Sequence, residues 1–159
     1  MAISPNTNFA VGQVLTSTQA NQFPRGIMAI ATSTTSDTNI TSTETVQLTA
    51  STFTAVANRY YRITYFEPQA LPAAGIPNFI QCKIRLTNTS GTCFATGSNT
   101  ADTNQNPAVG ASITVVTAQT LTAGSVVIVA TAVVNGGTGS CVRSGTQPAI
   151  LLVEDMGPA

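Results

Sequence analysis

Two stretches of the sequence alternate with a period of two residues, and they limit the chain to a β fold. In RYYRITYF (59–66), one face carries Tyr60, Arg62, Thr64 and Phe66, and the other carries Tyr61, Ile63 and Tyr65. In FIQCKIRL (79–86), an apolar face of Ile80, Cys82, Ile84 and Leu86 opposes Gln81, Lys83 and Arg85. Successive side chains of a β-strand point to opposite faces of a sheet, so each stretch predicts a strand with one face in the core.

Shorter apolar runs, separated by turn-forming residues, continue this pattern along the chain. They include GIMAIATS (26–33), TNITSTETVQLT (38–49), VVIVATAVV (126–134) and PAILLVED (148–155). In the second run we expect Val46 and Leu48 to point inward. About eight strands at such spacings are typical of sandwiches and barrels. We therefore predict an all-β domain over residues 26–159, an antiparallel β-sandwich that is jelly-roll-like.

The N-terminal residues 1–25 have a different character and predict an extended arm. Thr16 is a good N-cap, and Gln19 follows at the spacing of a capping box, which predicts a short helix near residues 17–22. Pro24 then ends the helix. A helix this short is unstable alone in water, so the arm must lean on the β domain or on a neighbouring molecule.

The surface that this composition allows is polar but almost uncharged. Only 8% of residues are charged and the formal net charge is zero. Such a surface is poorly repelled from copies of itself, which favours a protein that works in an assembly. Nucleic-acid binding needs clustered Lys and Arg, so no nucleic-acid partner is expected.

The sequence also gives no membrane or export signal. It contains no apolar run long enough for a transmembrane helix, and its first residues do not resemble a secretory signal. We expect no membrane partner, and a protein that stays in a cytosol until it is assembled.

Residues that carry catalytic chemistry are scarce. His is absent, which removes the commonest general base and metal ligand. The carboxylates are Asp37, Glu44, Glu67, Asp102, Glu154 and Asp155. No pair is recognisable as the two carboxyls of a glycosidase, and Glu154 and Asp155 are expected to be solvated or to accept N–H groups at a strand end. We predict no enzymatic activity, no catalytic residue and no cofactor.

One segment imitates a metal-binding loop. Asp102, Asn104 and Asn106 alternate as oxygen ligands of calcium do. The later Gly and Glu of that pattern are missing, so turn formation is the favoured interpretation and no metal is expected.

The three cysteines do not form a zinc motif. Cys82 lies in the alternating pattern and is expected in the core, as a small apolar residue. Cys93 and Cys141 would pair only if loops brought them together, and a reducing compartment disfavours that pairing.

Three stretches resemble proteins of a known kind. NTNFAVGQVLTSTQANQFPRGIMA near the start, FTAVANRYYRITYFEP in the middle and LLVEDMGPA at the end are similar to small structural proteins of tailed bacteriophages, especially those of actinobacterial hosts. Those proteins are described as decoration, head-fibre or minor tail components. The resemblance implies a jelly-roll-like β domain, often trimeric, with an extended N-terminal arm and no catalytic residues.

Together these observations predict a homotrimeric capsid decoration protein, located in the virion and assembled in the host cytoplasm. Its partners would be copies of itself and the major capsid protein or another virion protein. The apolar anchors expected to dock the arm are Phe9, Val14, Leu15 and Phe23. The trimer contacts are expected at Tyr60, Tyr61, Arg62 and Tyr65, because Tyr and Arg are enriched at interface hot spots.

Three alternatives stay open at this point. The arm could fold back onto its own domain. The same fold could serve as a minor tail or receptor-binding protein that contacts host surface glycans, with an exposed pocket around Tyr61, Glu67 and Arg85. A β-sandwich hydrolase would need two carboxylates that converge in a groove.

Overall fold

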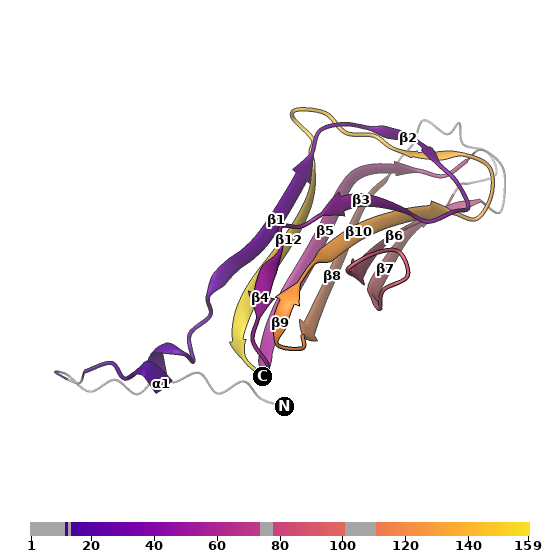
Figure 1. Cartoon of the computed structure of the whole chain (residues 1–159). Coiled ribbons are helices and arrows are strands. Elements are labelled where there is room, and N and C mark those ends of the chain that lie inside the picture. Colours follow the sequence, from indigo (N-terminus) through magenta and orange to yellow (C-terminus); the bar gives the residue numbers. More distant parts are fainter. Residues whose placement is uncertain (1–11, 13, 74–77, 101–110) are drawn as a thin grey trace.

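The computed structural model describes residues 12, 14–73, 78–100 and 111–159 of the chain (Figure 1). Strands dominate these residues, and every strand pairing among them is antiparallel. The all-β, antiparallel character that the sequence predicts is therefore confirmed.

The strands form two large sheets and one small ribbon. Sheet A contains, in order, β1 (Gly26–Ser33), β12 (Ala149–Pro158), β5 (Arg59–Leu71), β11 (Gly139–Cys141) and β2 (Asp37–Ile40), and β8 (Ala111–Thr120) pairs with the free edge of β5. Sheet B contains β3 (Thr45–Thr49), β10 (Ile128–Val134), β6 (Phe79–Leu86) and β7 (Cys93–Thr100) in that order. The ribbon joins β4 (Phe53–Ala55) to β9 (Gly124–Val126).

The two sheets share one hydrophobic core, built from the alternating faces that define their strands. Sheet A contributes Tyr61, Ile63 and Tyr65 of β5, which are fully buried. Sheet B contributes Ile80, Cys82 and Ile84 of β6, which are also fully buried. The inward face predicted for β6 is thus confirmed, and so is the core position of Cys82. In β5, Tyr61 and Tyr65, which the sequence analysis assigned to the trimer contact, lie in the core instead.

One inward residue was predicted wrongly. Leu48 of β3 is buried, but Val46 remains 44% exposed. The pairing of β3 with β10 skips Gln47, because Leu48 opposes Ala130 and Val46 opposes the next residue of β10, Thr131. This β-bulge places Val46 and Leu48 on opposite faces of sheet B, although they are two residues apart.

The cysteines are free thiols. Cys141 is buried in β11, whereas Cys93 is exposed at the start of β7. The pairing of Cys93 with Cys141 that the sequence left open is therefore not present.

The chain before β1 leaves the strands and extends beyond one end of the sheets (Figure 1). It contains helix α1 (Ser17–Ala20), which is shorter than the predicted 17–22. Thr16 Oγ1 accepts a hydrogen bond from the Gln19 amide, and Gln19 Oε1 accepts one from the Thr16 amide, so both sides of the capping box are formed. Among the described residues, no helix has the length and apolar character to cross a membrane.

Strands β7 and β8 pack closely against each other at Gly97. A Cβ atom at Gly97 would lie 2.7 Å from Ile113 Cγ2 and 2.9 Å from Val115 Cγ2. We expect Gly97→Ala to lower the free energy of unfolding by about 1–3 kcal/mol, because the added methyl overlaps two branched side chains of β8. Chemical denaturation of the purified protein measures this change.

Gly145→Ala is the matched control, because a Cβ atom there meets no atom within 4 Å. It should leave the unfolding midpoint nearly unchanged. Equal midpoints for the two variants would contradict the close packing of β7 on β8.

Candidate assembly interface

The large apolar side chains that remain exposed are not scattered over the molecule. In the described part of the chain there are eight, and seven of them lie on the arm or on the strands of sheet A. These seven are Val14, Leu15, Phe23, Ile27, Ile30, Val116 and Met156. The eighth, Val46, lies on sheet B. Elements on which exposed large apolar side chains gather are candidates for an interaction site.

The register of sheet A places several of these side chains on one face, the face away from the core. Ile30 of β1 lies opposite Leu152 of β12, Leu152 opposite Thr64 of β5, and Thr64 opposite Val116 of β8. This row crosses four strands, and its two end residues are about half exposed. We call this surface the outer face of sheet A.

Two of the four residues predicted for the trimer contact lie on this face. Tyr60 and Arg62 have the same orientation on β5 as Thr64, and Arg62 is exposed. Tyr61 and Tyr65 point the opposite way into the core and have no accessible surface. Strand alternation explains the split, because neighbouring residues of a strand cannot share a face. Of the four predicted residues, therefore, only Tyr60 and Arg62 can contact a partner.

The outer face carries one ion pair. Arg62 Nη2 lies 2.7 Å from Glu154 Oε2, and Arg62 Nε lies 2.8 Å from the same oxygen. Both side chains keep contact with water, so the pair contributes little to stability. Its effect is to leave the outer face with no net charge.

The arm presents the other exposed apolar side chains. Val14 is 83% exposed, and Leu15 and Phe23 are exposed to lesser degrees. Phe9, the fourth predicted anchor, lies outside the described residues. In this chain the apolar anchors Val14 and Leu15 thus remain accessible to a partner.

A buried ion pair holds the base of the arm. Arg59 Nε lies 2.7 Å from Asp155 Oδ2, and Arg59 Nη2 lies 2.8 Å from Oδ1 of the same carboxylate. The same guanidinium donates to two carbonyls of the arm, that of Phe23 at 2.6 Å and that of Asn21. We call this arrangement the Arg59–Asp155 pair.

The Asp155 carboxylate is kept ionised by its surroundings. Burial by itself would raise its pKa, but hydrogen bonds from Arg59 and from the Gly157 amide outweigh that effect, and the pKa lies below its usual value. Charge-assisted hydrogen bonds of this kind are roughly twice as strong as neutral ones. The Arg59 side chain thus makes four hydrogen bonds, two to Asp155 and two to the arm, and these fix the base of the arm against the β domain.

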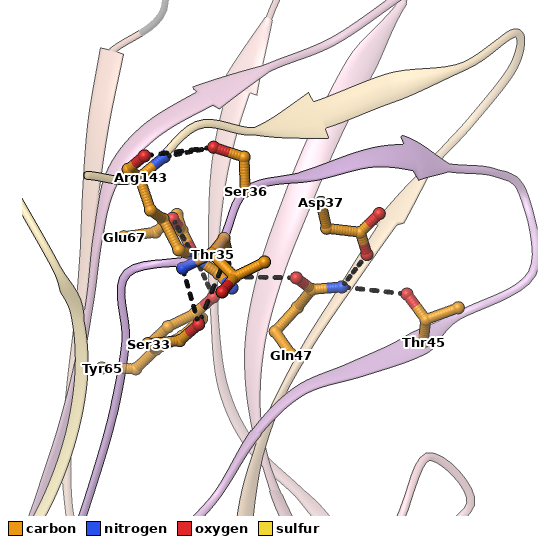
Figure 2. A network of polar contacts seen from close by, with 9 residues as sticks. All are labelled: Ser33, Thr35, Ser36, Asp37, Thr45, Gln47, Tyr65, Glu67 and Arg143. Atoms are coloured by element: carbon orange, nitrogen blue, oxygen red, sulfur yellow. Dashed lines mark hydrogen bonds and ion pairs between the residues drawn. The ribbon is translucent and has the colours of Figure 1, made fainter. Parts of the chain in front are cut away.

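The second buried ion pair lies at the other end of β5 (Figure 2). Arg143 Nη2 lies 2.6 Å from Glu67 Oε2, and Tyr65 Oη donates to the same oxygen at 2.6 Å. Arg143 also donates to Gln47 Oε1 at 2.9 Å and to the Thr35 carbonyl. Burial raises the pKa of Tyr65 well above its usual value, so the phenol stays protonated and donates. This network ties the loops before β2 and after β11 to β3 and β5.

The pocket expected for a glycan-binding tail protein is not formed. Tyr61 and Glu67 are fully buried, and Glu67 is occupied by Arg143. Arg85 lies on the opposite sheet, where it pairs with Glu44. The three residues do not meet at the surface, so they do not form the exposed pocket that was expected for a glycan-binding protein.

Glu44 is the most heavily paired carboxylate of sheet B. It accepts hydrogen bonds from Lys83 at 3.1 Å, from Arg85 Nη2 at 2.9 Å and from the Thr131 hydroxyl. Burial would raise the pKa of Glu44, but these donors outweigh it and lower the pKa from 4.5 to about 2. Such a carboxylate is too weak a base to accept a proton from a substrate at neutral pH.

Each described carboxylate accepts hydrogen bonds from a neighbouring side chain or amide. Asp37, the last one to consider, accepts from the Asn39 amide at 3.0 Å and from Gln47 Nε2 at 2.8 Å. Among the described residues no group of His, Cys, Asp and Glu is arranged to hold a metal. Asp102, with the loop considered for calcium, lies outside the described residues.

The inward positions of Arg59 and Arg143 and the burial of Asp155 were not predicted from the sequence. Asp155 was expected to be solvated or to accept an N–H group. It does accept the Gly157 amide at 2.8 Å, but it is buried against Arg59. A usable signal existed, because Arg59 and Glu67 fall in the alternation of the inward residues of β5. Arg143 follows the short strand β11 and had no comparable pattern.

Neither a comparison with protein-family models nor a comparison with curated proteins finds a match for the chain. The interpretation of this surface therefore depends on its residues.

Replacing the Arg59–Asp155 pair should release the arm from the domain. We propose the double variant Arg59→Met/Asp155→Asn, which avoids leaving a buried charge unpaired. Hydrogen bonds from a charged donor contribute roughly 1.5–3 kcal/mol each. Loss of the bonds to Asn21 and Phe23 should accelerate amide exchange in residues 19–24 by at least about tenfold, measured by hydrogen exchange and mass spectrometry.

The control is Arg62→Met/Glu154→Gln, which removes the exposed ion pair between the same two strands. It should leave exchange in residues 19–24 unchanged. If both double variants affect the arm equally, the Arg59–Asp155 pair does not hold it.

Acid should weaken the fold through Glu44. Because its pKa is lower in the folded chain than the usual 4.5, its stabilising contribution is complete above pH 4.5 and is lost as the pH falls towards 2. The stability difference between wild type and Glu44→Gln should be largest near neutral pH and shrink over this range. Denaturation at a series of pH values measures it, and a constant difference would contradict the assignment.

Proposed function

We propose that this protein is a non-enzymatic structural component of a bacteriophage virion, a homotrimeric decoration protein that binds the assembled head. The observation that carries the proposal is the gathering of seven exposed large apolar side chains on the arm and on sheet A. In a protein with so few charges, this surface is the one most suited to contact other protein. The resemblance of its sequence stretches to phage structural proteins supports the same assignment.

The strand order supports a jelly roll, the architecture that the proposal implies. Four long strands of sheet A follow the order β1-β12-β5-β8, and sheet B follows the order β3-β10-β6-β7. In chain order these eight strands therefore alternate between the sheets, except where β6 and β7 form a hairpin. Eight strands in two sheets connected in this way match the double Greek key of jelly rolls, which occur in viral capsid proteins.

The proposed mechanism is mechanical. The apolar anchors of the arm, Val14, Leu15 and Phe23, are exposed and become buried when the arm contacts the shell or a sister subunit. Each bound copy adds buried interface, and that interface must be lost before the shell can open. The hydrolase alternative has no support of this kind, because the described carboxylates are already paired.

The proposal is tested with particles of the phage that encodes the chain. Heads purified from a gene-deletion strain are mixed with purified protein and sedimented. Wild-type protein should sediment with the heads. Leu15→Asp should reduce binding at least about tenfold, because an ionised side chain would have to be buried without a partner.

Val46→Asp is the matched control, since Val46 is also exposed but lies on sheet B. It should bind as well as wild type. Absence of wild-type protein from the sedimented heads would overturn the proposed function.

A further inference from the structure

Two apolar surfaces of this chain lack a cover, and they lie on different sides of the molecule. One is the arm, with Val14 and Leu15 exposed. The other is the outer face of sheet A, with Ile30 and Val116 exposed. Contact between two such apolar surfaces would remove both from water.

The arm does not lie on the outer face of its own sheet. Arg59 and Asp155 belong to the core-facing side of β5 and β12, and they hold the arm carbonyls of Asn21 and Phe23 on that side. A Cβ atom at Gly157, at the end of β12, would lie 3.5 Å from the Gln22 carbonyl oxygen, so the base of the arm packs against the end of this strand. The arm therefore extends away from the end of sheet A and does not lie along its outer face (Figure 1).

We propose that the arm of one copy lies across the outer face of sheet A in a second copy. This inference rests on the proposed function only in requiring that the protein forms a homo-oligomer. It names the occupant of the outer face and the contacts that hold the copies together.

The length of the arm fits this role. An extended chain covers about 3.3 Å per residue and a helix about 1.5 Å, so residues 14–20, which precede the turn that Arg59 holds, reach roughly 16 Å. Four neighbouring strands spaced about 4.8 Å apart span about 15 Å. The arm can thus cross β1, β12, β5 and β8 of a neighbouring copy.

The charges fit as well. Residues 12–24 contain no charged side chain. The ionic groups on the outer face are Arg62 and Glu154, which neutralise each other. An arm that docks beside them buries apolar surface and leaves no charge without its partner.

The contact is head-to-tail, because the arm and the outer face are different surfaces. Heterologous contacts of this kind close into rings when the rotation permits, and a trimer is such a ring. Residues 14–20 would then hold the copies together.

The experiment uses engineered cysteines in the full-length chain. Leu15→Cys and Val116→Cys are made as separate proteins in a Cys93→Ser background, because the other two native thiols are buried. The two proteins are mixed and oxidised with oxidised glutathione. A disulfide forms between the new thiols as glutathione disulfide is reduced to two glutathiones. We expect a covalent heterodimer on a non-reducing gel.

Val46→Cys replaces Val116→Cys in the control mixture, because it places an equally accessible thiol on sheet B. It should give at least about tenfold less heterodimer. Equal yields from both mixtures would overturn the proposal.

A double variant, Leu15→Cys/Val116→Cys, distinguishes an arm that lies on a second copy from an arm that lies on the outer face of its own sheet. Exchange gives covalent oligomers, whereas a product that stays at the mass of one chain would show that the arm covers its own sheet. Light scattering of wild type and Leu15→Asp adds a second measurement. A wild-type protein that is monomeric, or a Leu15→Asp variant that keeps the wild-type mass, overturns the inference.

These outcomes separate the inference from the proposed function. Wild-type protein that binds heads without forming the heterodimer would contradict only arm exchange. Protein that forms the heterodimer but does not bind heads would contradict only the decoration role.

Discussion

The burial of one face of each strand between sheets A and B is the constraint on which the rest of this structure depends. Tyr61, Ile63 and Tyr65 point into the core from sheet A, and Ile84 meets them from sheet B. Because a strand alternates, the orientation of these side chains also decides that Arg59 points inward. The apolar core thus dictates where ionic groups must be buried.

The two buried ion pairs follow from this constraint and define the ends of the domain. Arg59 meets Asp155 near the arm, and Arg143 meets Glu67 at the opposite end of β5. Every buried side-chain nitrogen and oxygen of the described residues has a hydrogen-bond partner. Buried pairs contribute less to stability than their short distances suggest, because both charges lose their hydration. Their clearer role here is geometric, since each one holds irregular backbone against a strand.

The proposed function depends on a contrast between the two sides of sheet A. On the core-facing side, Arg59 binds two backbone carbonyls of the arm, and these contacts are made within one chain. The outer face carries exposed apolar side chains such as Ile30 and Val116 and no net charge. A surface of this kind is stabilised by covering it with another protein, which is the physical basis for both the proposed decoration role and the proposed exchange of arms.

The sequence by itself determined the β class, the alternation of β5, the inward face of β6, and the capping box of Thr16 and Gln19. Each of these depends on residues a few positions apart, so a local pattern can reveal it. Only the tertiary structure decided which charges meet and which apolar residues stay uncovered. Arg59 and Asp155 are 96 residues apart, and the bulge that exposes Val46 arises from pairing with a distant strand. Pairing between strands far apart in sequence is set by the packing of the whole core, which no local period encodes.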